Sequence, residues 1–139
     1  MEISDIKRVA ENYMQVWDSG KDGLLEKWAC KDLIVEYTHF EKPLNGIEQY
    51  RKILIQSYLS FPDITISVDE INAIQDKAIV KWKYTGTHKN DVLFGVAPEG
   101  KRVTVTGISI LDFCNDRVSR EYGIVDNLSL VLQLGALRM

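Results

Sequence analysis

The 139-residue sequence has few of the groups that bind metals, nucleotides or cofactors. It contains two cysteines and two histidines, and neither Cys30 nor Cys114 has a partner at the spacing of metal ligands. Glycine-rich phosphate loops and a nucleophile elbow are also missing. We therefore expect no metal site and no cofactor, and we interpret the two cysteines as buried, reduced thiols.

Clustered positive charge and long apolar runs are missing as well. The 17 lysines and arginines are spread along a chain of net charge −3, which argues against the basic surface of a nucleic-acid-binding protein. No segment has the apolar length of a membrane span, and the first residues lack the apolar core of a signal peptide. We therefore expect no nucleic acid and no membrane as partners, and a cytoplasmic location.

Regularly spaced apolar residues are what the sequence does have. Hydrophobic residues make up 45% of a chain that is long enough for one substantial core, so we predict a single domain over residues 1–139. Ser4 is expected to cap a first helix, whose apolar residues recur every three or four positions until Gly20.

Two more helical patterns and a series of strands follow. Residues 23–28 predict a short helix, and Asn45–Gly46 opens a longer one that ends before Pro62. Residues 86–100 are expected to form a long loop. Alternating apolar and polar residues predict strands at 30–40, 64–72, 77–87, 101–113 and 117–125.

This order of elements indicates an α+β fold. We expect three N-terminal helices packed on one face of a strongly curved antiparallel sheet, with a short C-terminal helix. The concave face of such a sheet leaves a cavity for a small molecule. Core packing is the alternative role for each aromatic residue there. The side chains expected to bind a substrate are Tyr13, Trp17, Trp82, Tyr84, Ser109 and Tyr122, with His39 at the rim.

Two acidic residues near the C-terminus have different predicted orientations. Glu121 should point away from the cavity if Tyr122 points into it, unless a bulge at Gly123 changes the alternation. Asp126 stands where the strand pattern changes into helical spacing. There it can cap the helix, or it can face an apolar cavity that raises its pKa and permits proton transfer near neutral pH. The local spacing leaves both roles open.

A set of residues distributed over nearly the whole chain matches a known pattern. These residues are Trp82, Gly86–His88, Phe94–Val103, Gly107–Ile110, Val118, Tyr122, Asp126 and Gln133–Gly135. Together they resemble the SnoaL-like polyketide cyclase, or predicted ester cyclase, family. The resemblance implies a cone-shaped α+β barrel, shared with ketosteroid isomerase and nuclear transport factor two, that is commonly a homodimer through the outer face of the sheet.

The resemblance also implies a type of chemistry. Members of the family close a ring of an aromatic polyketide by intramolecular aldol condensation, without metal or cofactor. The aspartate that matches Asp126 abstracts a proton next to an ester carbonyl. Ser109 stands where many relatives carry His or Asp, and Tyr122 stands where many carry Trp.

We therefore expect a cofactor-independent cyclase- or lyase-type enzyme that acts on a small polyketide-like or cyclic substrate. Asp126 would be its general base and then its acid, and Tyr84, Tyr122 and Ser109 would orient the substrate or donate to the oxyanion. One alternative is a non-catalytic protein that binds an apolar or aromatic small molecule, with Asp126 only as a cap. The other is a related isomerase or hydrolase.

A homodimer is predicted through the outer face of the sheet. The residues expected to face outward there are Lys81, Lys83, Thr85, Thr104, Thr106 and Ile108.

Overall fold

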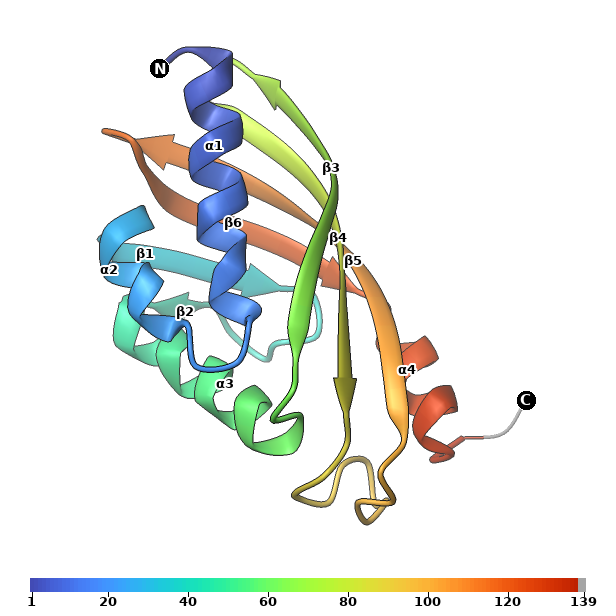
Figure 1. Ribbon diagram of the computed structural model, residues 1–139. Helices are drawn as coiled ribbons and strands as arrows, with labels where there is room; N and C mark the ends of the chain where they lie inside the picture. Colours follow the sequence, from blue (N-terminus) through green and yellow to red (C-terminus); the bar gives the residue numbers. More distant parts are fainter. Residues whose placement is uncertain (138–139) are drawn as a thin grey trace.

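The computed structural model describes residues 1–137 and has an α+β architecture (Figure 1). Within these residues it contains α1 (Ile3–Met14), α2 (Leu25–Trp28), α3 (Ile47–Ser60) and α4 (Asn127–Leu134), with two 3₁₀ turns between α1 and α2. The strands are β1 (Ala29–Tyr37), β2 (Leu44–Asn45), β3 (Thr65–Ile74), β4 (Lys77–Thr87), β5 (Arg102–Cys114) and β6 (Arg117–Val125). The predicted fold class is confirmed, and the short strand β2 is an addition to it.

The strands form one curved sheet in the order β2–β1–β6–β5–β4–β3. Its neighbouring strands are antiparallel, apart from β1 and β6, which run parallel. This parallel pair is the one departure from the predicted antiparallel sheet. It arises because the chain crosses from β1 through α3 to the far edge of the sheet and returns along the β3–β6 meander. The sheet does not close within residues 1–137, so β2 and β3 form its two edges.

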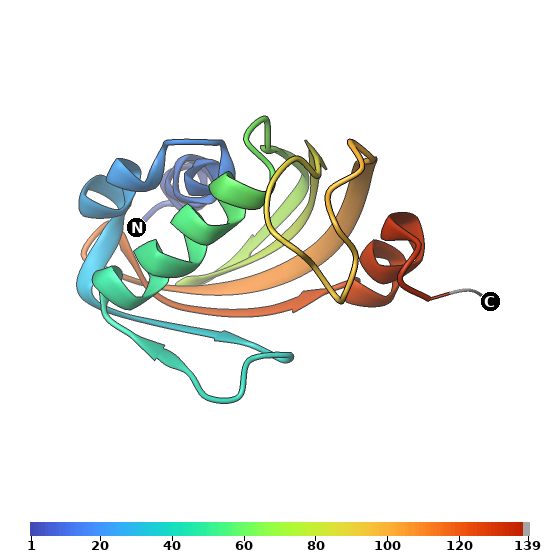
Figure 2. The ribbon, with the colours of Figure 1, turned by 90° about the horizontal axis from the view of Figure 1, so that it is seen from below.

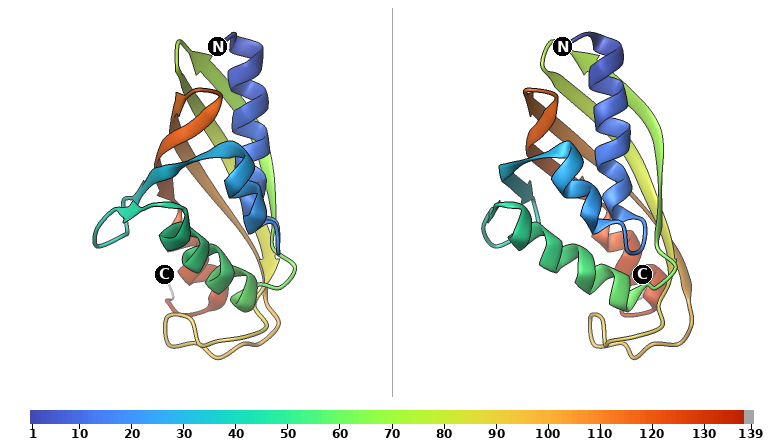
Figure 3. Two further views of the ribbon diagram at one scale, coloured as in Figure 1. Left: turned by 90° about the vertical axis from the view of Figure 1, so that its left-hand side faces the viewer. Right: turned by 60° about the vertical axis from the view of Figure 1, so that its left-hand side comes forward.

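The three N-terminal helices cover one side of the sheet, and α4 lies beside the beginning of β5 (Figure 2). α1 runs alongside β3 (Figure 3). Its buried stripe consists of Ile6, Val9, Ala10, Tyr13 and Met14, as the helical spacing predicts. No helix in the described part of the chain is long and apolar enough to cross a membrane.

Two local predictions in the N-terminal half need correction. Ser4 lies inside α1 rather than capping it, because Glu2 is the N-cap residue and its N–H donates to Asp5 Oδ2 at 3.3 Å. The two cysteines are not both buried. Cys30 is half-buried, whereas Cys114 is exposed at the end of β5.

A bulge in β6 decides which of its side chains face the core. Phe113 of β5 pairs with Val118, whereas Asp112 pairs with Arg120, so Ser119 is an extra residue without a partner opposite it. An extra residue shifts the alternation of side chains by one. The second half of β6 therefore presents its odd-numbered residues to the helices.

Candidate functional site

A cavity of about 270 Å³ lies between the concave face of the sheet, the C-terminal half of α3 and the loop 88–101. Its walls are mostly apolar, and its lining residues within the described chain include one imidazole and no carboxylate. Seven of the lining residues carry aromatic rings other than imidazole: Trp17, Tyr37, Phe40, Phe61, Trp82, Tyr84 and, at the mouth, Phe94. The cavity is therefore suited to a flat, largely apolar ligand.

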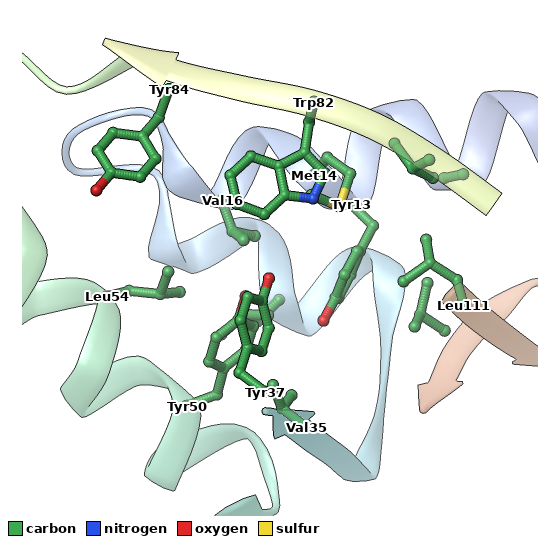
Figure 4. Packing of buried hydrophobic residues seen from close by; sticks show 14 of the residues in the cluster. Tyr13, Met14, Val16, Val35, Tyr37, Tyr50, Leu54, Trp82, Tyr84 and Leu111 are labelled. Carbon is green, nitrogen blue, oxygen red and sulfur yellow. The ribbon is translucent and has the colours of Figure 1, made fainter. Parts of the chain in front are cut away.

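The rings of β4 form one wall of this cavity. Trp82 and Tyr84 project from the same face of the strand and stack with their centroids 6.3 Å apart (Figure 4). The hydroxyl of Tyr84 points away from the tyrosines deeper in the core (Figure 4). Burial raises the pKa of Tyr84 far above its usual value, so this hydroxyl stays protonated and can donate a hydrogen bond at neutral pH.

A fully buried carboxylate, that of Glu121, lies beside the cavity. Each of its oxygens accepts two hydrogen bonds. Oε1 accepts from the hydroxyls of Tyr13 at 2.7 Å and Tyr50 at 3.3 Å. Oε2 accepts from the hydroxyls of Tyr37 at 2.5 Å and Ser109 at 2.7 Å. Burial of a charge is costly unless such partners compensate it.

The Glu121 cluster is linked to the cavity by two side chains that line the cavity wall. Tyr37 is one of them, and its hydroxyl is held by Glu121. Trp82 is the other, and its Nε1 donates to Ser109 Oγ at 2.9 Å. Because Tyr37 donates to Glu121 and Trp82 donates to Ser109, which is itself bound to Glu121, the cluster holds both rings in place.

The tyrosines of the cluster are held in their neutral form. Burial, and then the negative charge of Glu121, raises the pKa of Tyr13, Tyr37 and Tyr50 well above the usual value of 10.0. They therefore act as hydrogen-bond donors throughout the neutral pH range.

Asp126 does not line the cavity. Its Oδ1 accepts from the backbone N–H of Ser129 at 3.0 Å, and the side chain is exposed. It is the N-cap of α4, which ends at Gly135 with φ 81°. Asp126 instead borders a groove on the outer side of the sheet, together with Lys81, Ile108 and Leu128. Of the two roles left open for Asp126, the structure places its carboxylate in the capping position.

Tyr122 is also outside the cavity, because its side chain is 40% exposed on the outer face of β6. The bulge at Ser119 explains the correction, since it turns Glu121 inward and Tyr122 outward. Gly123 packs against the ring of Tyr37, and a Cβ there would lie 2.8 Å from its Cζ. β6 therefore does contain a bulge, but at Ser119, four residues before the possible position at Gly123.

The remaining predicted site residues fall into two groups. Trp17, His39, Trp82 and Tyr84 line the cavity, whereas Tyr13 and Ser109 belong to the Glu121 cluster beside it. Sequence reasoning missed Glu121 and Tyr50. Tyr50 lies on the buried stripe of α3. Glu121 follows the buried Val118 by three residues, and in a strand this spacing puts both side chains on the same face only if a bulge lies between them.

His39 lies at the mouth of the cavity, because it borders both the cavity and the outer groove. Its ring makes edge contacts with Tyr37 at 5.9 Å and Phe40 at 4.8 Å between centroids. Partial burial lowers the pKa of His39 below its ordinary value of 6.5, so the imidazole is neutral at pH 7.

Comparison with solved structures shows that this fold is shared. AclR from Streptomyces galilaeus, named as a candidate hydroxylase, has a TM-score of 0.86 and 20% identity, over 99% of this chain and 85% of AclR. IdmH from Streptomyces antibioticus, named as a candidate polyketide cyclase, has a TM-score of 0.83 and 21% identity, over 94% of this chain and 98% of IdmH.

A third structure shows the wider fold group. It is a protein from Catenulispora acidiphila with a ketosteroid isomerase-like fold, with a TM-score of 0.76 and 12% identity, over 91% of this chain and 92% of that protein. At these identities the likeness concerns the fold alone.

No curated protein matches the sequence significantly. A family model matches residues 7–134, and the chain belongs to the SnoaL-like polyketide cyclase family.

Proposed function

We propose that this protein is a cofactor-independent acid–base enzyme of the cyclase type, acting on a small, polyketide-like aromatic molecule in the cavity. The family and the aromatic cavity walls support this proposal. The observation that carries it furthest is the set of ionisable groups in the cavity wall. His39 is the single lining residue, within residues 1–137, whose ordinary pKa lies near neutrality.

His39 is the proton acceptor in this proposal. Its lowered pKa keeps the imidazole neutral at pH 7, as a general base requires. The imidazole removes a proton from the carbon next to a carbonyl group. The resulting enolate carbon attacks a second carbonyl carbon of the same molecule, and the imidazolium then returns its proton to the new alkoxide.

The two nearby carboxylates, those of Glu121 and Asp126, are both poorly placed to act as the base in place of His39. The Glu121 carboxylate already accepts four hydrogen bonds and does not line the cavity, so a ligand there does not reach its oxygens. Asp126 lies on the outer side, in contact with the N-terminus of α4.

Tyr84 and Trp17 supply donors for the oxygen atoms of the substrate. The Tyr84 hydroxyl stays protonated and can donate to the developing oxyanion. The indole N–H of Trp17, in the cavity wall, is buried and has no partner among the described residues. An oxygen atom on the ligand would give it the acceptor it lacks.

The proposed proton transfer is tested by deuterium exchange. Methyl 1-naphthylacetate is an aromatic ester with exchangeable protons next to its carbonyl, and their replacement in D₂O is followed by NMR. We expect the protein to accelerate the exchange, His39→Gln to slow it by at least ~10-fold, and Asp126→Asn to leave it unchanged. As the pH drops, the rate should fall with a midpoint below the ordinary histidine pKa of 6.5, because burial lowers the pKa of His39 and protonated His39 cannot accept a proton. Loss of exchange in Asp126→Asn with full exchange in His39→Gln would restore Asp126 as the base.

A second candidate function is binding without catalysis. The capping role of Asp126 and the complete hydrogen bonding of Glu121 favour it, because neither carboxylate lines the cavity. It predicts that the same ester quenches the fluorescence of Trp82 and Trp17 but exchanges no faster than in buffer.

We also propose that the protein is a homodimer through the outer face of the sheet. The outward side chains include an apolar stripe over β4, β5 and β6, which we call the outer stripe: Ile79, Ile108, Ile110, Tyr122 and Ile124. Its members are neighbours, since Ile110 pairs with both Ile79 and Tyr122, and Ile108 pairs with Ile124. A contiguous exposed apolar surface of this kind marks an association site.

A further inference from the structure

The loop 88–101 is fixed at its base and exposed at its tip. The backbone N–H of Lys89 donates to the carbonyl oxygen of Ser60 at 3.0 Å. The side-chain amide of Asn90 donates to the carbonyl oxygen of Leu59 at 2.8 Å. These bonds tie the base of the loop to the last turn of α3, and the loop crosses the end of the molecule between α3 and α4 (Figures 1 and 2).

The tip of this loop is a two-residue hairpin turn. Leu93 and Val96 exchange both backbone hydrogen bonds, at 3.0 and 2.9 Å. The central residues, Phe94 and Gly95, have φ angles of 50° and 77°. Positive φ at both central positions defines a type I′ turn, in which Asn-Gly and Asp-Gly are the favoured pairs.

Phe94 is an unfavourable residue at this position. Positive φ is rare for a bulky side chain and is found mainly where other constraints hold it. Core packing does not supply the constraint, because Phe94 is 57% exposed. Its ring nevertheless forms part of the cavity wall, together with Leu93 of the same turn. The side chain is thus poorly suited to the turn and only partly covered, yet it lies at the opening of the cavity.

We propose that Phe94 is a gate that closes over a planar aromatic ligand in the cavity and selects for such ligands. This inference rests on the proposed function, because it assumes that the cavity binds a small aromatic molecule. Stacking on the ligand would bury the exposed part of the ring and extend the aromatic wall formed by Trp82 and Tyr84. The anchored base of the loop holds the ring at the mouth, so that little order is lost on closing.

A gate of this kind has a kinetic signature. The ligand enters past an open Phe94 and is then retained by the closed ring, so Phe94 controls dissociation more than association. It also has a signature in stability, because asparagine fits positive φ better than phenylalanine. Replacing Phe94 should therefore weaken binding without weakening the fold, which is opposite to the effect of removing a structural residue.

The test compares Phe94→Asn with Val92→Asn. Val92 lies in the same loop and is 64% exposed, but it does not line the cavity. The probe is flavone, a planar aromatic ketone that quenches tryptophan fluorescence, and its binding is followed by stopped-flow. We expect Phe94→Asn to release flavone at least ~10-fold faster with little change in association rate. Its urea midpoint should equal or exceed that of the wild type, and Val92→Asn should release flavone at the wild-type rate.

Three results would overturn the gate. Flavone dissociation from Phe94→Asn within twofold of the wild type would show that the ring does not retain the ligand. A lower urea midpoint of Phe94→Asn with equally fast release from Val92→Asn would show that the loop has only a structural role. A wild-type protein that takes up no flavone, and no methyl 1-naphthylacetate in the exchange assay, would end both this inference and the proposed function. Unchanged release with active exchange would end the gate alone.

Discussion

Glu121 shows how one buried residue organises a site from behind its wall. Its carboxylate accepts hydrogen bonds from hydroxyl groups on α1, β1, α3 and β5. Among them, Tyr37 contributes its ring to the cavity. The charge therefore acts through the side chains it holds rather than on a ligand directly. A well-ordered cavity wall follows, because each ring is fixed at its polar end.

Replacing Glu121 by glutamine should be strongly destabilising. The amide nitrogen cannot accept from two of the four hydroxyl donors, and the buried donors lose the charge that stabilises them. We expect Glu121→Gln to lower the free energy of unfolding by about 3–5 kcal/mol, measured by urea denaturation. Glu36→Gln is the control, because Glu36 on β1 forms a half-exposed pair with Arg120 at 3.1 Å and should cost less than ~1 kcal/mol. Equal effects of the two variants would contradict the role of the cluster.

The raised pKa values of the buried tyrosines predict that the protein loses stability at alkaline pH. The pKa values of Tyr13, Tyr37 and Tyr50 are raised in the folded protein, so above pH 10 the unfolded state binds fewer protons than the folded state. Stability from these groups is complete below pH 10 and falls as the pH rises further, by up to ~1.4 kcal/mol per pH unit for each tyrosine. Urea midpoints between pH 9 and pH 11 measure the slope. Tyr37→Phe should reduce the slope by about one proton, and an unchanged slope would contradict the assignment.

At the scale of elements, the sequence predicted what local patterns control. The alternation of Val103, Val105 and Leu111 in β5, and the αL stop at Gly135, depend on neighbours along the chain, and both were confirmed. The prediction of which β6 side chains face the core was wrong, because the bulge at Ser119 arises from the pairing of β6 with β5. A one-residue register shift of this kind cannot be read from one strand alone. The same error hid Glu121 and placed Tyr122 in the cavity.

Gly107 is the point at which β5 makes room for the cavity wall. It pairs with Trp82, and a Cβ there would overlap the indole ring and lie 2.8 Å from the carbonyl oxygen of Ile124. We expect Gly107→Ala to cost about 1–3 kcal/mol and to change the tryptophan emission, because Trp82 must move away from Ser109. Gly23→Ala is the matched control, since a Cβ at Gly23 meets no atom within 4 Å. A wild-type urea midpoint in Gly107→Ala would show that the ring moves at no cost.

At the scale of the whole molecule, the arrangement of helices on a curved sheet followed from the order of the elements along the chain, as expected. The parallel pairing of β1 with β6 did not, because it joins segments about 85 residues apart. The position of Asp126 also depends on the whole molecule. Its spacing fits both a cap and a cavity residue, and only the packing of α4 against β5 places it on the outer side.

The outer stripe gives the last prediction, which concerns assembly. Ile110 stands at its centre, paired with Ile79 on one side and Tyr122 on the other. In a dimer formed through this face, Ile110→Glu would bury an unpaired charge, so we expect sedimentation equilibrium at micromolar concentration to show a dimer for the wild type and a monomer for the variant. Ile55→Glu, on the exposed side of α3, is the control and should remain dimeric. The outer groove beside Asp126 borders the same stripe, so a dimer would cover both surfaces. A wild-type protein that is monomeric at micromolar concentration would refute the dimer.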